Sequence, residues 1–105
     1  MLEIFENYSV ANPDCKIKPI ESNLSINELL IILENHFKTQ EYNNIFIDNN
    51  FCEIYAKKNG FEVSLQLIQS KQGSLINASV YGRNKRGKTR KYLKQLLTDI
   101  KNIIK

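Results

Sequence analysis

The chain has 105 residues, of which 42% are hydrophobic and 25% charged, and its formal net charge is +4. This size and composition are typical of one globular domain over residues 1–105 that buries its core without disulfides or metals. No apolar stretch approaches the ~20 residues that cross a bilayer, and the acidic start has no leader pattern. We therefore expect a cytoplasmic protein with no membrane contact.

The first 24 residues contain both prolines and several Asn, Asp and Ser, which predicts a mostly irregular lead-in. Within it we expect an edge strand over Leu2–Phe5 and a short strand over Cys15–Lys18. Ser25 and Glu28 then form the S-x-x-E capping-box pattern, and apolar residues follow at helical spacing. This pattern predicts a helix that ends near Thr39.

From Asn44 onward, apolar and polar residues alternate, which predicts strands over 45–48, 51–58, 61–69 and 74–81. Turns are expected at Asn49-Asn50, at Asn59-Gly60 and over residues 70–73, and Asn-Gly is the strongest short-range hairpin signal. A two-residue Asn59-Gly60 turn places apolar residues opposite one another on a single face. The expected pairs are Ala56 with Val63, Ile54 with Leu65, and Cys52 with Leu67.

The last segment predicts a second helix, with leucines and isoleucines from Leu93 to Ile104 on one stripe and Arg90, Lys94 and Lys101 beside it. The expected fold is α+β: a helix, a four-stranded antiparallel meander and a C-terminal helix, with both helices packed on one sheet face. With the extra N-terminal strand, the element order resembles one repeat of the TATA-binding-protein fold. That resemblance is in element order alone and implies no function.

Residues 82–89 match the phosphate-binding loop pattern G-x-x-x-x-G-K-[S/T]. In nucleotide hydrolases this pattern lies in a parallel α/β sheet, and a later strand carries a carboxylate that holds magnesium. Only sixteen residues follow Thr89, and they read as one helix. The upstream candidate carboxylate, Asp48, precedes the pattern in the chain, so we do not interpret it as a nucleotide-hydrolysing loop.

Charge is segregated along the chain. Residues 1–80 have a net charge of −4 and residues 81–105 a net charge of +8, and all three arginines lie in the second segment. Cations at a helix start oppose the helix dipole, whereas an anionic partner there is favoured. The candidate anion- or nucleic-acid-binding residues are Arg83, Lys85, Arg86, Lys88, Arg90, Lys91 and Lys94. The alternative is a solvated charge run, with lysines inflated by an AT-rich genome, whose charges pair with acidic residues of the first segment or with an acidic protein.

The predicted sheet face away from the helices is polar with embedded aromatics, and its Lys57 is opposite Glu62. Aromatic side chains could stack on unpaired bases, but this face lacks the positive charge that would attract the phosphate backbone of a single strand. We therefore consider it a possible protein interface or homodimer contact, centred on Phe46, Tyr55 and Tyr81. The alternative is a partly exposed face shielded by the N-terminal segment.

No catalytic set can be assembled, because the chain has one histidine, His36, and no paired carboxylates or metal-ligand spacing. We interpret His36 as structural and Cys52 as a buried thiol, and we expect no metal or other cofactor. The leading hypothesis is a non-enzymatic module that binds nucleic acid or another polyanion. The competing hypothesis is a protein-interaction module, such as an immunity-type or regulatory protein or a homodimer, that uses the open sheet face.

Overall fold

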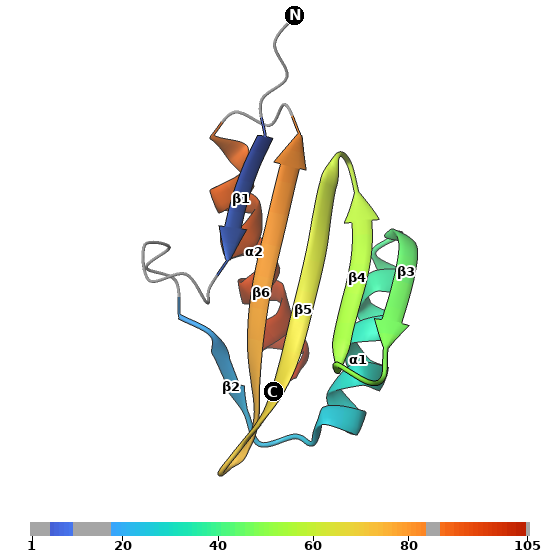
Figure 1. Ribbon diagram of the computed structural model, residues 1–105, viewed down its shortest axis with the longest axis vertical. Coiled ribbons are helices and arrows are strands. Elements are labelled where there is room, and N and C mark those ends of the chain that lie inside the picture. The colour runs from blue at the N-terminus through green and yellow to red at the C-terminus, as the bar shows by residue number, and fades with distance from the viewer. Residues whose placement is uncertain (1–4, 10–17, 84–86, 105) are drawn as a thin grey trace, which may run out of the picture.

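The computed structural model describes residues 5–9, 18–83 and 87–104, and the remaining residues, 1–4, 10–17, 84–86 and 105, lie outside the described part. Two helices and an antiparallel sheet make up this part, so the predicted α+β class is confirmed (Figure 1). The elements are β1 (Phe5–Ser9), β2 (Ile20–Ser22), α1 (Ile26–Thr39), β3 (Asn43–Asp48), β4 (Glu53–Lys58), β5 (Phe61–Ser70), β6 (Gly73–Arg83) and α2 (Lys88–Ile103).

Five strands lie side by side in the order β1-β6-β5-β4-β3, with every neighbouring pair antiparallel. The predicted meander is present as β3 to β6. β1 pairs with the last five residues of β6, and β2 pairs with residues 74–76 near its start, so both short strands share one edge of β6 (Figure 1). This arrangement adds strands to the four that the sequence pattern predicts.

The two N-terminal strands differ from the expected ones in position. β1 runs from Phe5 to Ser9, whereas the expected edge strand was Leu2–Phe5, of which residues 2–4 lie outside the described part. The strand expected over Cys15–Lys18 falls mostly on undescribed residues, and Lys18 is not in a strand. β2 begins two residues later, at Ile20, because the buried Ile20 pairs with Ile76 on β6. That long-range contact is not encoded in the local pattern.

The Asn59-Gly60 hairpin forms as predicted. Asn59 has φ 53° and Gly60 has φ 83°, as a type I′ turn requires. The pairs Ala56–Val63 and Ile54–Leu65 are both present. The expected register between β4 and β5 is therefore confirmed.

The turn before β4 differs from the prediction. Four residues, 49–52, separate β3 from β4, and Asp48 pairs with Glu53, so Asn49-Asn50 is not a two-residue turn. The Asp48 carboxylate accepts hydrogen bonds from the backbone N–H groups of Asn50 and Phe51, at 3.0 and 3.2 Å. This Asx turn holds the wider loop and places Phe51 in it rather than in a strand.

The capping box that begins α1 is confirmed, because Ser25 and Glu28 each accept a hydrogen bond from the other's backbone N–H. Leu29, Leu33 and Phe37 are fully buried at i, i+4 and i+8, and the helix ends at Thr39 as expected. α2 likewise buries one stripe. Its buried residues are Thr89, Leu93, Leu96, Leu97 and Ile100.

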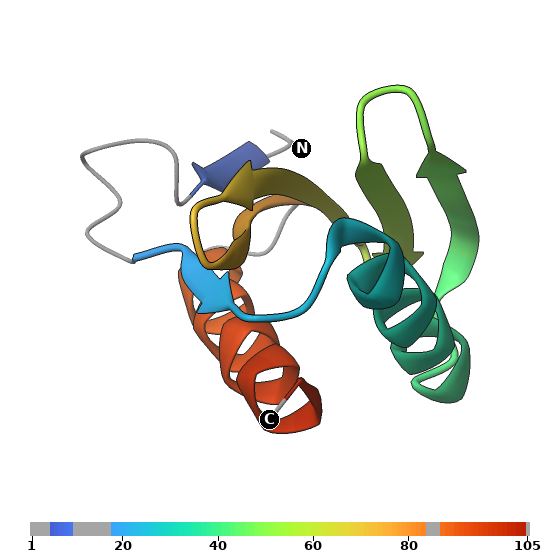
Figure 2. The same cartoon turned by 90° about the horizontal axis from the view of Figure 1, so that it is seen from below.

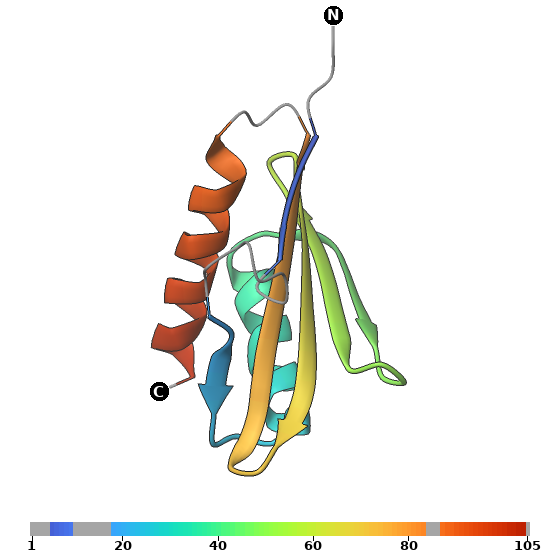
Figure 3. The same ribbon diagram turned by 60° about the vertical axis from the view of Figure 1, so that its left-hand side comes forward.

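Both helices lie on the same side of the sheet but cover different halves of it (Figure 2). α1 contacts β3, β4 and β5, whereas α2 contacts β6 and β1, and their buried residues join the sheet residues in one core. Figure 3 shows that α2 forms a separate layer beside β6. No helix in the described part covers the opposite sheet face, which we call the open sheet face.

Neither α1 nor α2 is long and apolar enough to cross a bilayer, and the described residues contain no other helix.

Candidate functional site

The cationic residues around the start of α2 form the candidate anion-binding site, which we call the basic surface. Its described members are Arg83, Lys88, Arg90, Lys91 and Lys94; the other two predicted members, Lys85 and Arg86, lie outside the described residues. Arg83 is the last residue of β6, and the other four occupy the first two turns of α2. All are exposed except Arg90, which is half-buried. The end of β6 and the start of α2 lie at the same end of the sheet, so Arg83 and Lys88 are at that end (Figure 1).

Gly87 is the N-cap residue of α2 and has φ 74°, a left-handed conformation that costs an L side chain roughly 1–2 kcal/mol. The first turn that follows contains no acidic residue. Its cations therefore add to the positive end of the helix dipole, which is unfavourable in the absence of an anion.

The described part of the chain does not neutralise the cations of α2. Within it, no carboxylate lies within 4.0 Å of Lys88, Arg90, Lys91 or Lys94. The ion pairs of the described residues lie elsewhere, between Lys38 and Glu34 on α1 and between Lys57 and Glu62 on the sheet. Asp99, the acidic residue of α2, instead accepts a hydrogen bond from the Gln95 amide at 2.9 Å.

The phosphate-loop pattern has a different geometry from that of a nucleotide site. Its first glycine, Gly82, lies inside antiparallel strand β6, where it pairs with Phe61. Its threonine, Thr89, is fully buried on the core side of α2. A nucleotide loop needs a parallel sheet and a Ser/Thr hydroxyl directed at bound magnesium. The letters of the pattern are present, but neither of these two conditions is met.

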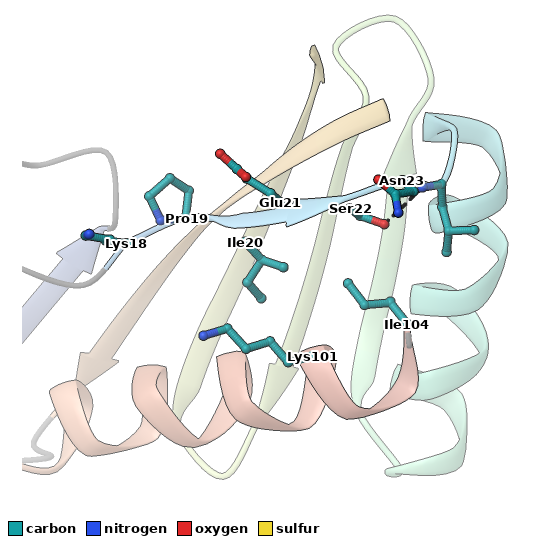
Figure 4. A pocket seen from close by; sticks show the side chains of 9 residues that line it. Lys18, Pro19, Ile20, Glu21, Ser22, Asn23, Lys101 and Ile104 are labelled. Carbon is teal, nitrogen blue, oxygen red and sulfur yellow. Dashed lines mark hydrogen bonds between the residues drawn. The ribbon is translucent and has the colours of Figure 1, made fainter. Parts of the chain in front are cut away.

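A groove between β2 and the end of α2 was not predicted. Lys18 and Lys101 flank this cavity of about 960 Å³, and Ile20 and Ile104 contribute apolar wall (Figure 4). Lys101 thus extends the cationic side of α2 toward β2. Sequence periodicity places Lys101 on the helix, but only the tertiary fold brings β2 beside it.

The open sheet face carries two of the three predicted interface residues together. Phe46 on β3 is directly opposite Tyr55 on β4, with ring centroids 6.1 Å apart, and 59% of Phe46 is exposed. Tyr81 lies on β6 in register with Glu62, two strands away from Tyr55 and in another row of the sheet. The structure therefore supports an aromatic pair and does not place Tyr81 in it.

Two carboxylates of this face have partners on the same face. Lys57 and Glu62 form the expected pair at 3.1 Å. The Tyr55 hydroxyl donates a hydrogen bond to the Glu53 carboxylate, and this bond raises the pKa of Tyr55 above its ordinary value. Such internal pairing leaves little net field to attract a phosphate backbone.

An aromatic cluster joins the connection between α1 and β3, the start of β5 and α2. The hydroxyls of Tyr42 and Tyr92 are hydrogen-bonded, and the Tyr92 ring stacks on Phe61 with a centroid distance of 4.2 Å. Burial is the main reason that the pKa of each tyrosine is raised. The sequence signal for this cluster was weak, because its members lie far apart in the chain.

His36 is half-buried beside Phe37, with ring centroids 6.0 Å apart, and burial lowers its pKa. Cys52 is half-buried rather than fully buried, because it lies in the turn before β4 with φ 53°. Among the described residues, no group of three or more His, Cys, Asp or Glu side chains is arranged to hold a metal ion.

Comparison of the chain with protein-family models, with characterised proteins and with solved structures finds no match.

Proposed function

We propose that this protein is a small non-enzymatic binding module whose basic surface contacts an anionic partner, and that this partner is nucleic acid. The observation that carries the proposal is the set of α2 cations at Lys88, Arg90, Lys91 and Lys94, which have no carboxylate neighbour in the described part of the chain. A polyanion would supply the missing countercharge. It would also release the counterions condensed on it, which favours binding.

The dimensions of the cationic side favour an extended ligand over a single phosphate group. Arg90, Lys94 and Lys101 lie within about 40° of one another around α2, at ~3.6 residues per turn, and α2 rises about 16 Å from Arg90 to Lys101, at ~1.5 Å per residue. Duplex DNA carries a charge roughly every 1.7 Å along its axis, so a helix of this length can contact several phosphates at once. A mononucleotide would occupy only one end of this row.

The buried Thr89 and the antiparallel setting of the phosphate-loop pattern support a binding role without nucleotide hydrolysis. If the pattern held a nucleotide, Lys88 would be its phosphate-binding lysine. We therefore expect Lys88→Ala to leave the affinity for any mononucleotide unchanged while weakening nucleic-acid binding. Isothermal titration calorimetry with ATP and with a short DNA duplex measures the mononucleotide affinity and the nucleic-acid affinity separately.

The main test is binding to short single- and double-stranded nucleic acids across a salt titration. We expect affinity to fall steeply with salt, and to be lost in the variant in which Arg83, Arg86 and Arg90 are all alanine. The matched control is the triple alanine of Lys38, Lys57 and Lys71, which removes equal charge elsewhere. Absence of binding at low salt, or equal loss in both triple variants, contradicts a specific role of the basic surface.

A second candidate function is a protein-interaction module that uses the open sheet face. The observation that favours it is the exposure of large apolar side chains there: Phe46 lies opposite Tyr55, and Phe51 in the adjoining turn is 70% exposed. We expect Phe46→Glu or Tyr55→Glu to disrupt assembly with a partner. Substitutions in the basic surface should leave that assembly unchanged.

A further inference from the structure

The open sheet face carries exposed apolar side chains on several neighbouring strands. Phe46, Tyr55 and Ile68 are exposed on β3, β4 and β5, and Leu75 lies beside Ile68 on β6 in the same register. Isolated exposed apolar residues are normal on protein surfaces, but several on one uncovered sheet face are typical of an interaction surface.

Three carboxylates on the β3–β5 part of this face have donors within the face, so a partner need not supply countercharges for them. Glu62 is bound by Lys57, Glu53 accepts from Tyr55, and Asp48 accepts from the turn that follows it. Covering the face therefore leaves no carboxylate of this group without a donor. A second surface with the same internal pairing could meet it without unpaired charge.

The face is also large enough for a stable contact. Five strands of 5 to 11 residues lie side by side. At ~4.8 Å between strands and ~3.4 Å per residue, they present on the order of 600 Å². Two such faces would bury about 1,200 Å², the lower end of the range for specific protein interfaces.

Charge segregation decides which partner fits. Two copies that met through α2 would bring their cationic sides together, whereas face-to-face sheets put both α2 helices on the outside. With sheets ~10 Å apart and a helix diameter of ~10 Å on each outer side, the two α2 axes would be about 30 Å apart. This separation exceeds the Debye length of ~8 Å several-fold, so repulsion between the cationic sides is screened.

We propose that a second copy of this chain docks on the open sheet face, giving a face-to-face dimer with Phe46 and Tyr55 in the contact. This inference rests on the second candidate function and names its partner. The dimer leaves both basic surfaces exposed, so it is compatible with polyanion binding but does not require it.

The test is the mass in solution of the full chain, measured by light scattering and sedimentation over about a hundredfold range of protein concentration. We expect wild type to shift from its 12.2 kDa monomer toward twice that mass. Phe46→Glu should weaken the dimer more than tenfold. The matched control is Ile31→Glu, which introduces the same charge at a 65% exposed apolar residue of α1, on the helical side of the sheet; it should dimerise as wild type does.

Circular dichroism of each variant checks that it is folded, and Ser64→Glu, a polar residue of the same face, provides a second probe. A wild type that stays monomeric throughout overturns the proposal, and so does a dimer that survives both face substitutions or is lost in Ile31→Glu. Nucleic-acid binding by the same samples is scored separately. Loss of dimer with intact binding, or intact dimer without binding, shows which of the two functions fails.

Discussion

Replacement of Gly73 by alanine should be the most damaging glycine substitution among those whose surroundings the structure defines. Gly73 begins β6 with φ 143°, a conformation that L residues rarely adopt. A Cβ atom there would lie 2.3 Å from the Ser22 carbonyl oxygen and 2.7 Å from the Asn23 carbonyl carbon. Both contacts are with backbone, so no side-chain rotation relieves them.

The magnitude has two parts. The backbone conformation costs alanine about 1–3 kcal/mol, and displacement of the β2–α1 connection adds roughly 1–3 kcal/mol. The loop is also held by the buried Ser74, whose hydroxyl donates to the Leu24 carbonyl at 2.8 Å, so the displacement strains that bond as well. We expect Gly73→Ala to lower the free energy of unfolding by about 2–6 kcal/mol in total.

Gly87→Ala is the matched control, because Gly87 has φ 74° but no heavy atom within 4 Å of its hypothetical Cβ. Its cost should be conformational only, about 1–2 kcal/mol. Urea unfolding followed by circular dichroism gives both values, and the difference appears as a lower midpoint for Gly73→Ala at unchanged slope. Equal midpoints for the two variants would contradict a steric clash between a Cβ atom at residue 73 and the Ser22–Asn23 backbone.

Three further predictions concern charge and protonation. Lys91→Gln combined with Lys94→Gln should reduce the slope of log affinity against log salt for duplex DNA by about 2, whereas Lys71→Gln should leave it unchanged in the same titration. Because the pKa of Tyr42 is raised above 10.0 in the folded state, its contribution to stability is present below pH 10.0 and lost as pH rises above it; Tyr42→Phe should therefore flatten the alkaline fall of the melting temperature. The pKa of His36 is lowered below 6.5, so its contribution is present above pH 6.5 and lost as pH falls; His36→Gln should flatten the acid side of the same profile, and an unchanged profile would contradict its partial burial.

Local chemistry explains why parts of the fold were predictable. Ser25 and Glu28 each accept a hydrogen bond from the other's backbone N–H, and this local pair begins α1. Asn59 and Gly60 both adopt positive φ, and this local turn forms the central hairpin. The β4–β5 register follows from that turn, because a two-residue hairpin fixes which side chains face each other. The Lys57–Glu62 pair was predictable for the same reason.

The candidate site was predictable in its residue types and only partly in its arrangement. The sequence places Lys88, Lys91 and Lys94 on one helix. In the described part of the chain no carboxylate lies within 4.0 Å of them, and this depends on where the fold places the acidic residues of the first segment. Alternation along the strands places Phe46, Tyr55 and Tyr81 on one face. The predicted meander order also places Tyr81 two strands from Tyr55, and the structure has this order.

The helices, the meander, the central register and the segregation of charge follow from the amino-acid sequence alone, because each depends on contacts within a few residues or on composition. The shared edge of β6 that pairs with β1 and β2, and the contact between Tyr42 and Tyr92, are known only from the folded structure. Each of these involves a backbone edge or side chain with several acceptable partners. The choice among them depends on packing of the whole core, where distant segments compete for the same space.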